Sequence, residues 1–459
     1  MRIGYSAPTL VPVHWPSRPV PGLAAGTPLL FDPELPYGED LLQFLWESRL
    51  FDARRLRTTD GRAVEVLRPG RIQRHSGPDL NDALLRIDGQ IWAGQVEVHI
   101  RSSEWNMHGH QHDPAYNNVV LHVVYAYDSE VRTEQGLVPP TVELRSRLHP
   151  QSLAAHRALM QGRSWVPCAP QVGRVEPART ELWLERVLVE RLERKTTEVE
   201  ALYRQLGNDP AGTFHHMLLR GFGAKVNAEP FALLARALPL RVLLKYRDDP
   251  FRREALLFGQ AGFLHGDYAE AYPRALYREY QILRHLHGLE PVPVAAWKFG
   301  RLRPANFPTV RLAQFARLLA RLDGDPASLT DLDDAAVIRT RLDVRAEGYW
   351  TDHYRFDHPG RSVAKRFGRA AADGLIINTI VPYLFAMGRI RGDQRLSDRA
   401  LHLLEQLPPE NNVITAGWAR HGLVARSAGR SQALIELKNT YCAQRKCLFC
   451  TIGTELLKR

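Results

Sequence analysis

Two acidic residues and a histidine lie close together in a stretch of the sequence that reads as two strands. Asp79 stands at the head of the first strand, and Glu97 and His99 lie two residues apart on the second. Side chains alternate between the faces of a strand, so Glu97 and His99 point the same way. The turn predicted at Asp88-Gly89 brings Asp79 beside Glu97. Two carboxylates with a neighbouring base are what Mg²⁺ or Mn²⁺ needs to activate water against a phosphodiester.

This arrangement resembles the core of the PD-(D/E)XK nucleases, with Asp79 after a proline and Glu97-Val98-His99 as the triplet. The resemblance implies that Asp79 and Glu97 are metal ligands. It also implies that His99 stands where the family has the lysine that helps to activate the attacking water. Histidine can act as a base near neutral pH or ligate the metal itself, so both roles stay open.

That family usually carries a further acid on a helix ahead of the hairpin, and EDLLQFLWESRLF has helical spacing there. The resemblance implies Glu47 for this catalytic role, with Glu39 as the second choice. No lysine precedes Lys195, so Arg101 is the nearest fixed cation on the strand face and a candidate phosphate contact. A purely structural interpretation is an ordinary hairpin with an exposed acid and an exposed histidine.

Histidines gather in the loop expected after the second strand, where His108, His110 and His112 alternate. Three imidazoles at this spacing are expected to line one face of an extended loop and to bind metal near His99. Contact with the scissile phosphate is a second interpretation, and a polar loop whose histidines bond backbone carbonyls is a third. His122 lies in the apolar run VVLHVVY and is expected to be a core histidine.

Cysteines give the second chemical signal: the chain holds Cys168, Cys442, Cys447 and Cys450. The last three lie within nine residues, and in a reducing compartment such clustering favours a metal site over disulfides. Four thiolates suit a tetrahedral Zn²⁺ or a [4Fe-4S] cluster. The split arrangement resembles the iron-sulfur staple of some RecB-family nucleases, although there the lone cysteine precedes the nuclease motifs and the spacing differs.

The composition favours an acidic partner. The chain has 61 lysines and arginines against 50 acids, a net charge of +11 and a pI of 9.6. Such an excess points to nucleic acid. Only eight of the 61 basic residues are lysines, so the same excess is also compatible with an arginine-rich genomic composition.

A basic and aromatic segment in the second half of the chain is a candidate nucleic-acid contact. Arg301 and Arg303 stand beside Trp297 and Phe299, ahead of a predicted helix that carries Arg311. Aromatic and cationic groups are mixed in this way on surfaces that bind single strands. The alternative is an amphipathic helix whose arginines are simply solvated.

The length of 459 residues exceeds one usual hydrophobic core, so two domains are expected. The fold class is α/β (α+β): a nuclease-like mixed sheet core followed by a mostly α-helical domain that holds the cysteine cluster. The expected divisions are an extended arm over 1–35, the α/β domain over 36–150, a linker over 151–175 and the helical domain over 176–459. After the long helix near 181–206, helices are expected at about 213–221, 228–238, 251–264, 269–287, 308–322, 371–387, 397–406 and 428–441.

Nothing in the sequence predicts a membrane partner. The longest apolar run, GLIINTIVPYLFAMG at 374–388, is interrupted by Asn378 and Pro382 and is shorter than the roughly eighteen residues of a spanning helix. The N-terminus lacks the basic start and the continuous apolar stretch of a secretory signal. A cytoplasmic protein is therefore expected.

From about Leu41 onward the chain is similar to a bacterial family catalogued as domain of unknown function 2851, which has no assigned reaction. Five segments carry the resemblance: GPDL at 77–80, GQVEVHIRSSEWNMHGHQHDPAYNNVVLHVV at 94–124, EALLFGQAGFL at 254–264, RLRPANFPTVRLAQFA at 301–316 and YCAQRKCLFCTIG at 441–453. The function must therefore come from the residues themselves.

Two classes of function follow from these residues. The first is a metal-dependent nuclease that hydrolyses the phosphodiester bonds of DNA or RNA. The second is a catalytically silent nuclease-like fold that binds nucleic acid or acts as a scaffold, which a histidine in the lysine's place would suit. A histidine-metal hydrolase acting on another substrate is a third interpretation. Convergence of Glu47, Asp79, Glu97 and His99 around one ion-sized space would favour the first.

Overall fold

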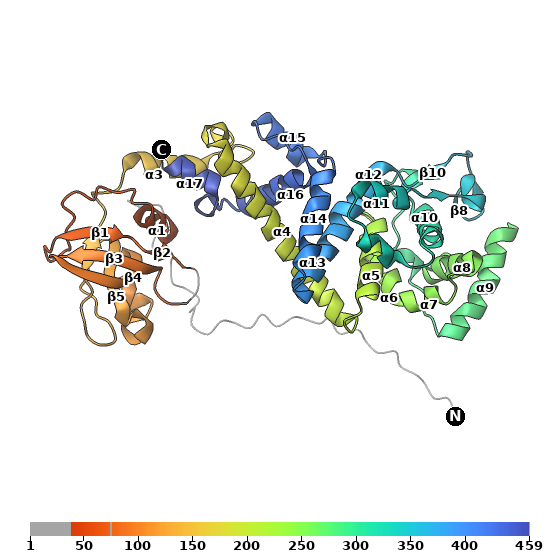
Figure 1. Cartoon of the computed structure of the whole chain (residues 1–459), viewed down its shortest axis with the longest axis horizontal. Coiled ribbons are helices and arrows are strands. Elements are labelled where there is room, and N and C mark those ends of the chain that lie inside the picture. The colour runs from red at the N-terminus through yellow and green to blue at the C-terminus, as the bar shows by residue number, and fades with distance from the viewer. Residues whose placement is uncertain (1–37, 74–75, 459) are drawn as a thin grey trace, which may run out of the picture. The chain divides into compact units, whose positions relative to one another are not determined.

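The structure is a computed structural model that describes residues 38–73 and 76–458. The chain divides into two compact units, residues 1–149 and 150–459, which Figure 1 colours along the sequence. The sequence predicted that the first domain ends at residue 150, one residue beyond the end of the first unit. The arm expected over 1–35 lies outside the described residues.

The N-terminal unit consists of a mixed sheet with one helix packed against it (Figure 1). Helix α1 (Glu39–Glu47) contacts strands β2 and β4 through an apolar face that includes Leu42, Leu45 and Trp46. The strands of the sheet are β1 (Val64–Arg68), β2 (Arg71–Ile72), β3 (Leu80–Ile87), β4 (Gln90–Arg101), β5 (Val119–Ala126) and β6 (Thr141–Glu143). Their order is β1-β3-β4-β5-β6, with β2 paired to β3.

The predicted hairpin between β3 and β4 is present, with its turn at Asp88-Gly89. Both turn residues have positive φ, 51° for Asp88 and 84° for Gly89, as a two-residue hairpin turn requires. The antiparallel register pairs Leu80 with Val96 and shifts between Leu80 and Ala83. Because Leu80 faces Val96, Asp79, which precedes Leu80, is brought opposite Glu97, which follows Val96.

Strands β4, β5 and β6 run parallel to one another. The crossover from β4 to β5 contains α2 (Glu104–Met107) and two short helical turns, η1 (His110–His112) and η2 (Pro114–Asn118). Strand β5 is buried along almost its whole length, as expected for a strand covered on both faces. An antiparallel hairpin joined to parallel strands gives the mixed sheet that the sequence predicted.

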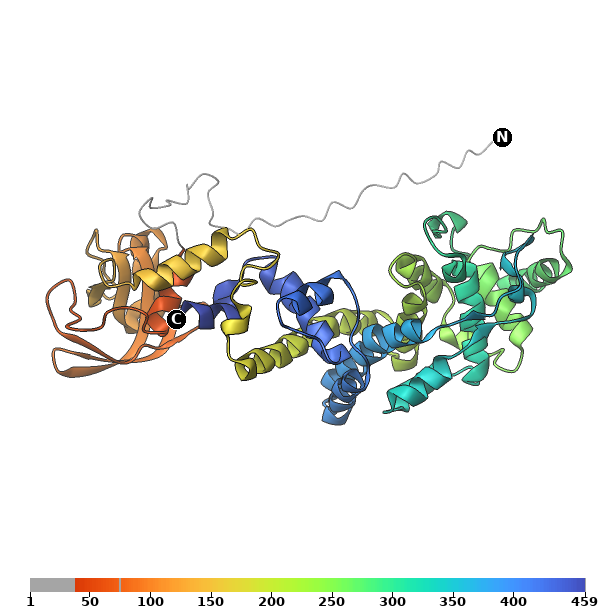
Figure 2. The same ribbon diagram turned by 90° about the horizontal axis from the view of Figure 1, so that it is seen from above.

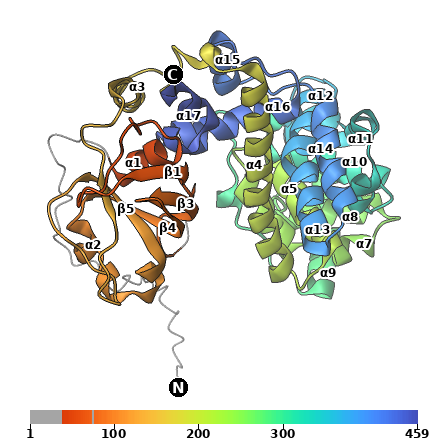
Figure 3. The same ribbon diagram turned by 60° about the vertical axis from the view of Figure 1, so that its left-hand side comes forward.

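The second unit is mostly helical, as expected, and includes the green to blue helices of Figures 1 and 2. The long helix α4 (Pro177–Gln205) packs along α13 (Val381–Arg391) and α16 (Ala428–Glu436), as Figure 3 shows. The other α-helices are α3 (Pro150–Gln161), α5 (Pro210–Phe222), α6 (Ala228–Ala237), α7 (Leu240–Leu244), α8 (Pro250–Gln260), α9 (Ala271–His287), α10 (Pro308–Arg321), α11 (Ala335–Leu342), α12 (Arg369–Leu375), α14 (Gln394–Gln406), α15 (Val413–Arg420) and α17 (Thr451–Leu457).

Two parts of this unit differ from the sequence expectation. The segment 151–175 is not a plain linker, because α3 occupies its first part and begins with Pro150 at a helix start, where proline is favoured. Two small strand pairs also interrupt the helices: β7 (Arg345–Ala346) with β10 (Lys365–Arg366), and β8 (His353–Arg355) with β9 (His358–Pro359). Strands of two or three residues are too short to leave an alternating pattern in the sequence.

The continuous helical segment Arg369–Arg391 is long and apolar enough to span a membrane by length and composition, but 78% of its apolar window is buried in the protein. It is interrupted by a π-helix, η8 (Ile376–Ile380), at the position of Asn378. Most of this segment therefore packs inside the protein as a core helix does, and cytoplasmic localisation stays a prediction.

The contact between α8 and α9 tests the packing of the helical core. A Cβ atom on Gly259 would lie 2.1 Å from the ring of Tyr280, which is 2% exposed. We therefore expect Gly259→Ala to lower the free energy of unfolding by about 1–3 kcal/mol and to lower the melting temperature. Gly374→Ala is the control, because nothing lies within 4 Å of its Cβ position and alanine favours a helix. Equal melting temperatures for the two variants would contradict the packing.

Candidate metal centre

Strand β4 carries an acid and a histidine of the centre on one of its faces. Glu97 and His99 alternate with Val96 and Val98, whose side chains lie on the opposite face in the sheet core. Glu97 is 4% exposed and His99 is 1% exposed. The interpretation as a hairpin with an exposed acid and an exposed histidine is therefore wrong.

Asp79 and Glu97 form a reciprocal pair across β3 and β4. The Asp79 backbone N–H donates to Glu97 Oε2 at 3.0 Å, and the Val98 backbone N–H donates to Asp79 Oδ2 at 3.0 Å. Burial raises the pKa of Asp79 to about 7, and the charge of Glu97 adds to this shift. Burial also raises the pKa of Glu97 to about 8. A cation bound beside the pair would favour the ionised form of both carboxyls.

Three histidines converge on Glu97. One ring nitrogen from each of His99, His108 and His110 lies within 4.8 Å of the others. His99 Nε2 is 3.2 Å from His108 Nδ1. Glu97 Oε1 lies 3.2 Å from His110 Nε2 and 3.6 Å from His99 Nε2. Three imidazole nitrogens and a carboxylate oxygen at these separations can surround a single metal ion.

His122 supports His99 from β5. Its Nε2 lies 2.8 Å from His99 Nδ1, and the side chain is fully buried, as expected for a core histidine. Burial lowers the pKa of His122 to about 3 and that of His99 well below its usual value. Burial also lowers the pKa of His108 and of His110. The imidazoles are therefore neutral at neutral pH, which is the form that binds metals, and the contact at Nδ1 orients His99.

The crossover between β4 and β5 places two of these histidines. Gly109, between His108 and His110, has a φ of 79° in the left-handed region, which lets the chain reverse there. Trp105 is fully buried, and its indole N–H donates to a backbone carbonyl at 2.9 Å. The Tyr116 ring stacks on His110 with 3.8 Å between the ring centroids. Both ring contacts hold the crossover against the sheet.

Helix α1 carries three polar side chains at a spacing of four residues, and the first two lie near the centre. Burial raises the pKa of Glu39 to about 8, and the nearby acids, Asp79 among them, add to the shift. The Gln43 side chain hydrogen-bonds the Asp79 carboxylate. Glu47 Oε1 instead accepts the Ile72 backbone N–H at 2.9 Å. The α1 acid that lies with the carboxylate pair is therefore Glu39, the second choice from the sequence, while Glu47 anchors β2.

Two other predicted side chains lie at the margin of the centre. His112 is exposed, because the expected extended loop is replaced by the helical turn η1, in which alternate residues do not share a face. Arg101 is exposed at the end of β4, and its backbone N–H donates to Glu104 Oε2 at 3.0 Å. The four cysteines lie in the helical unit, outside this centre.

Three residues near the centre were not predicted from the sequence: Gln43, Glu104 and Tyr116. The spacing of four between Glu39 and Gln43 was a usable signal, since residues four apart share a helix face. Nothing in the sequence marks Tyr116, because its contact with His110 depends on the reversal at Gly109.

A family described as "Protein of unknown function (DUF2851)" matches residues 39–413. The chain belongs to this family. No curated protein and no solved structure matches the chain significantly. The family match covers every side chain of the metal centre and Cys168, and it ends before the other three cysteines.

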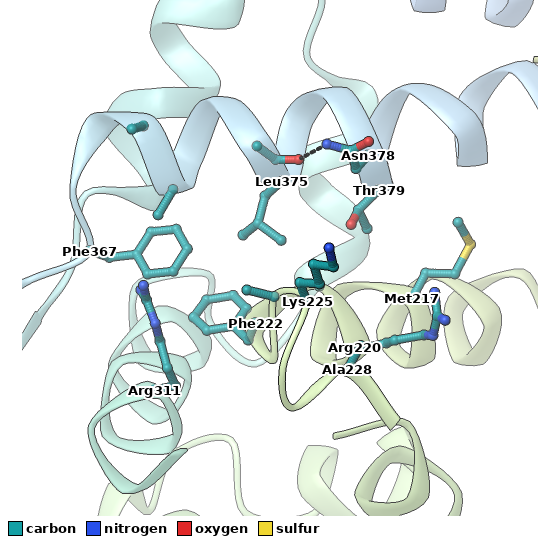
Figure 4. A pocket seen from close by; sticks show the side chains of 15 residues that line it. Met217, Arg220, Phe222, Lys225, Ala228, Arg311, Phe367, Leu375, Asn378 and Thr379 are labelled. Carbon is teal, nitrogen blue, oxygen red and sulfur yellow. Dashed lines mark hydrogen bonds between the residues drawn. The ribbon is translucent and has the colours of Figure 1, made fainter. Parts of the chain in front are cut away.

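The predicted nucleic-acid arginines of the helical unit lie in different surroundings. Arg301 and Arg303 are exposed. Arg311 lines a cavity of about 410 Å³, and its guanidinium lies 4.8 Å from the Phe367 ring centroid, as Figure 4 shows. Its hydrogen-bond acceptors are the side-chain oxygens of Asn306 and Gln314, and burial lowers its pKa to about 10.

The cavity of Figure 4 is basic on two sides: Arg220 and Lys225 line it together with Arg311. The predicted aromatic partner Trp297 is 6% exposed and donates its indole N–H to the Ala261 carbonyl at 2.7 Å. Trp297 is therefore a core residue here and offers no open face for stacking a base.

The raised carboxyl pKa values predict a pH dependence for the chelated protein. A carboxyl whose folded pKa is raised adds stability at low pH and loses it as the pH rises through that pKa. Above about pH 7 histidines are mostly neutral in both the folded and the unfolded state, so the carboxyls dominate. In EDTA we expect the melting temperature of the N-terminal unit to fall between about pH 7 and about pH 8.5.

Glu97→Gln should remove much of this fall, and added Mn²⁺ should reverse it in the wild-type protein only. Differential scanning calorimetry with spectroscopic assignment of the two units would measure both effects. A melting temperature that does not change with pH in EDTA would show that the folded protein does not hold these carboxyls in their protonated form.

The arginines of the helical unit predict a salt dependence of nucleic-acid binding. If Arg301 and Arg303 contact phosphates, Arg301→Gln combined with Arg303→Gln should reduce the slope of log affinity against log salt by up to about 2, since each contact contributes roughly 0.9. Arg311→Gln should instead lower the melting temperature, because its guanidinium is held inside the cavity wall. Arg395→Gln is the control, since Arg395 is an exposed arginine of the same unit. An unchanged slope in the double variant would remove this segment from the binding surface.

Proposed function

We propose that the N-terminal unit is a metal-dependent hydrolase that cleaves phosphodiester bonds in nucleic acid. The observation that carries the proposal is the convergence of a buried carboxylate pair and three neutral histidines on one ion-sized space. The order of a helix, an antiparallel hairpin and a parallel strand supports the nuclease interpretation. The net charge of +11 supports a polyanionic substrate.

The residues fit a divalent transition metal. His110 Nε2 is buried and has no hydrogen-bond partner, although Glu97 Oε1 lies 3.2 Å away. A buried nitrogen without a hydrogen bond is costly unless another group, such as a metal ion, uses its lone pair. Mixed imidazole and carboxylate donors suit Mn²⁺, Fe²⁺ or Zn²⁺, whereas Mg²⁺ prefers oxygen ligands and retained water. Of the two ions expected from the sequence, we therefore favour Mn²⁺.

In this proposal Glu97, His99, His108 and His110 would hold the metal. The bound ion would lower the pKa of a water molecule and would supply positive charge beside the scissile phosphate. Asp79 and Glu39 would be the carboxyls available to accept a proton, and the cation would favour their ionised form. In this proposal His99 binds the metal and does not take the role of the missing lysine, and His122 would position it.

Metal binding and cleavage should therefore be lost together when a ligand is changed. We expect Glu97→Gln to lower Mn²⁺ affinity and the rate of nucleic-acid cleavage by on the order of 100-fold or more, since loss of even a supporting group commonly costs about 10–100-fold. His112→Ala is the matched control, because it changes an exposed histidine of the same crossover. Calorimetric titration with Mn²⁺ and a cleavage assay on labelled DNA and RNA would measure both.

His99→Lys decides between the two roles of that residue. As a ligand variant it should lose metal affinity and activity together. Retained activity with a pH dependence moved upward would instead return His99 to the role of a base, because lysine's pKa is about four units above that of histidine. Wild-type protein that binds nucleic acid and never cleaves it with any divalent ion would favour the silent scaffold.

A further inference from the structure

The four cysteines of the chain gather in the helical unit, apart from the metal centre. Cys442 ends the π-helix η9 (Leu437–Cys442), Cys447 begins the 3-10 helix η10 (Cys447–Phe449), and Cys450 immediately precedes α17. Cys168 lies in the turns between α3 and α4. Electrostatic interactions link Cys168 with Cys447 and Cys450, and Cys442 with the other three, so the four thiols share one location.

Backbone contacts fix this location. The guanidinium of Arg445 donates to the carbonyls of Leu159 at 3.1 Å and Gly162 at 2.9 Å, which ties the segment between Cys442 and Cys447 to the end of α3. A Cβ atom on Gly453 would lie 2.2 Å from the Cys447 carbonyl oxygen. A side chain at position 453 would therefore prevent α17 from packing so closely on η10. The cysteine-bearing turns therefore pack tightly against the segment that leads to Cys168.

The surroundings suit thiolates that are bonded to a metal and not free thiols. Three of the four cysteines are buried and Cys442 is partly buried. The backbone amides of Ile452 and Gly453 donate to the Cys450 sulfur. The positive charges of Lys438 and Arg445 interact with the sulfurs of Cys442 and Cys447. Donors and cations that converge on buried sulfurs are typical of thiolate metal sites.

Two kinds of centre are bound by four thiolates, and they differ in the spacing of the sulfurs. A tetrahedral zinc ion with Zn–S bonds of about 2.3 Å holds its sulfurs about 3.8 Å apart. A cubane cluster holds them farther apart, because each thiolate binds a different iron atom.

We propose that Cys168, Cys442, Cys447 and Cys450 bind a [4Fe-4S] cluster. Each thiol loses its proton as its sulfur bonds to one iron, and the cluster crosslinks the last turns of the chain to the segment between α3 and α4. The site is independent of the histidine centre in residues, in unit and in metal. Its structural role follows from the position of the ligands, since three of them lie in a C-terminal segment that contacts α3 through α17 and Arg445.

The full-length protein purified without oxygen tests this proposal. We expect about four iron and about four acid-labile sulfide per chain, and an electron paramagnetic resonance signal after chemical reduction. Sulfide is the decisive measurement, because an iron ion held by the histidine centre brings none. One zinc per chain without sulfide, or folded protein with neither metal, would overturn the proposal without any variant.

Variants then locate the cluster. Cys168→Ser and Cys442→Ser should each lose most of the iron and sulfide and lower the melting temperature of the helical unit. His108→Ala is the control and should keep both, because it changes only the N-terminal centre. Iron and sulfide that persist in Cys168→Ser would show that the distant cysteine is not a ligand. Wild-type protein that holds the cluster and binds no Mn²⁺ would contradict the proposed hydrolase alone, so the two proposals fail separately.

Discussion

The burial of two carboxylates beside each other is the constraint on which the N-terminal unit depends. The β3–β4 register places Asp79 opposite Glu97, and each accepts a backbone N–H from the other strand. These hydrogen bonds offset only part of the desolvation, so burial still disfavours the ionised form of both carboxyls. The sheet, the crossover and α1 all bring further polar groups to this one point, and His110 and Gln43 are the closest examples.

One physical cause shifts the pKa values of the acids and of the histidines of the centre in opposite directions. Burial raises the pKa of Asp79 and Glu97 and lowers that of His99 and His122, so that every group is driven toward its neutral form. The cluster of donors and acceptors therefore carries little charge when no cation is bound. A divalent ion reverses the preference of the carboxyls and leaves the imidazoles neutral, so its binding couples to the release of protons from the acids.

Local patterns in the sequence predicted much of the fold, and the same patterns explain what was missed. The Asp88-Gly89 turn and the alternation of Glu97 with Val98 depend only on neighbouring residues, and both are present. The choice between Glu39 and Glu47 depends on which end of α1 approaches β3, which no spacing within the helix determines. His112 was placed by assuming an extended chain, whereas a positive φ at Gly109 and a helical turn decide its direction.

Two π-helices lie among the described residues of the helical unit, and their hydrogen bonds run from residue i to i+5 instead of i+4. One lies at the wall of the basic cavity at Asn378, and the other ends at Cys442. Removing one residue from 437–442 would restore α-helical geometry and rotate the C-terminal residues beyond this turn by about 100°. The last cysteines would then face away from Cys168. The length of this one turn therefore determines whether the C-terminal cysteines meet the segment that holds Cys168.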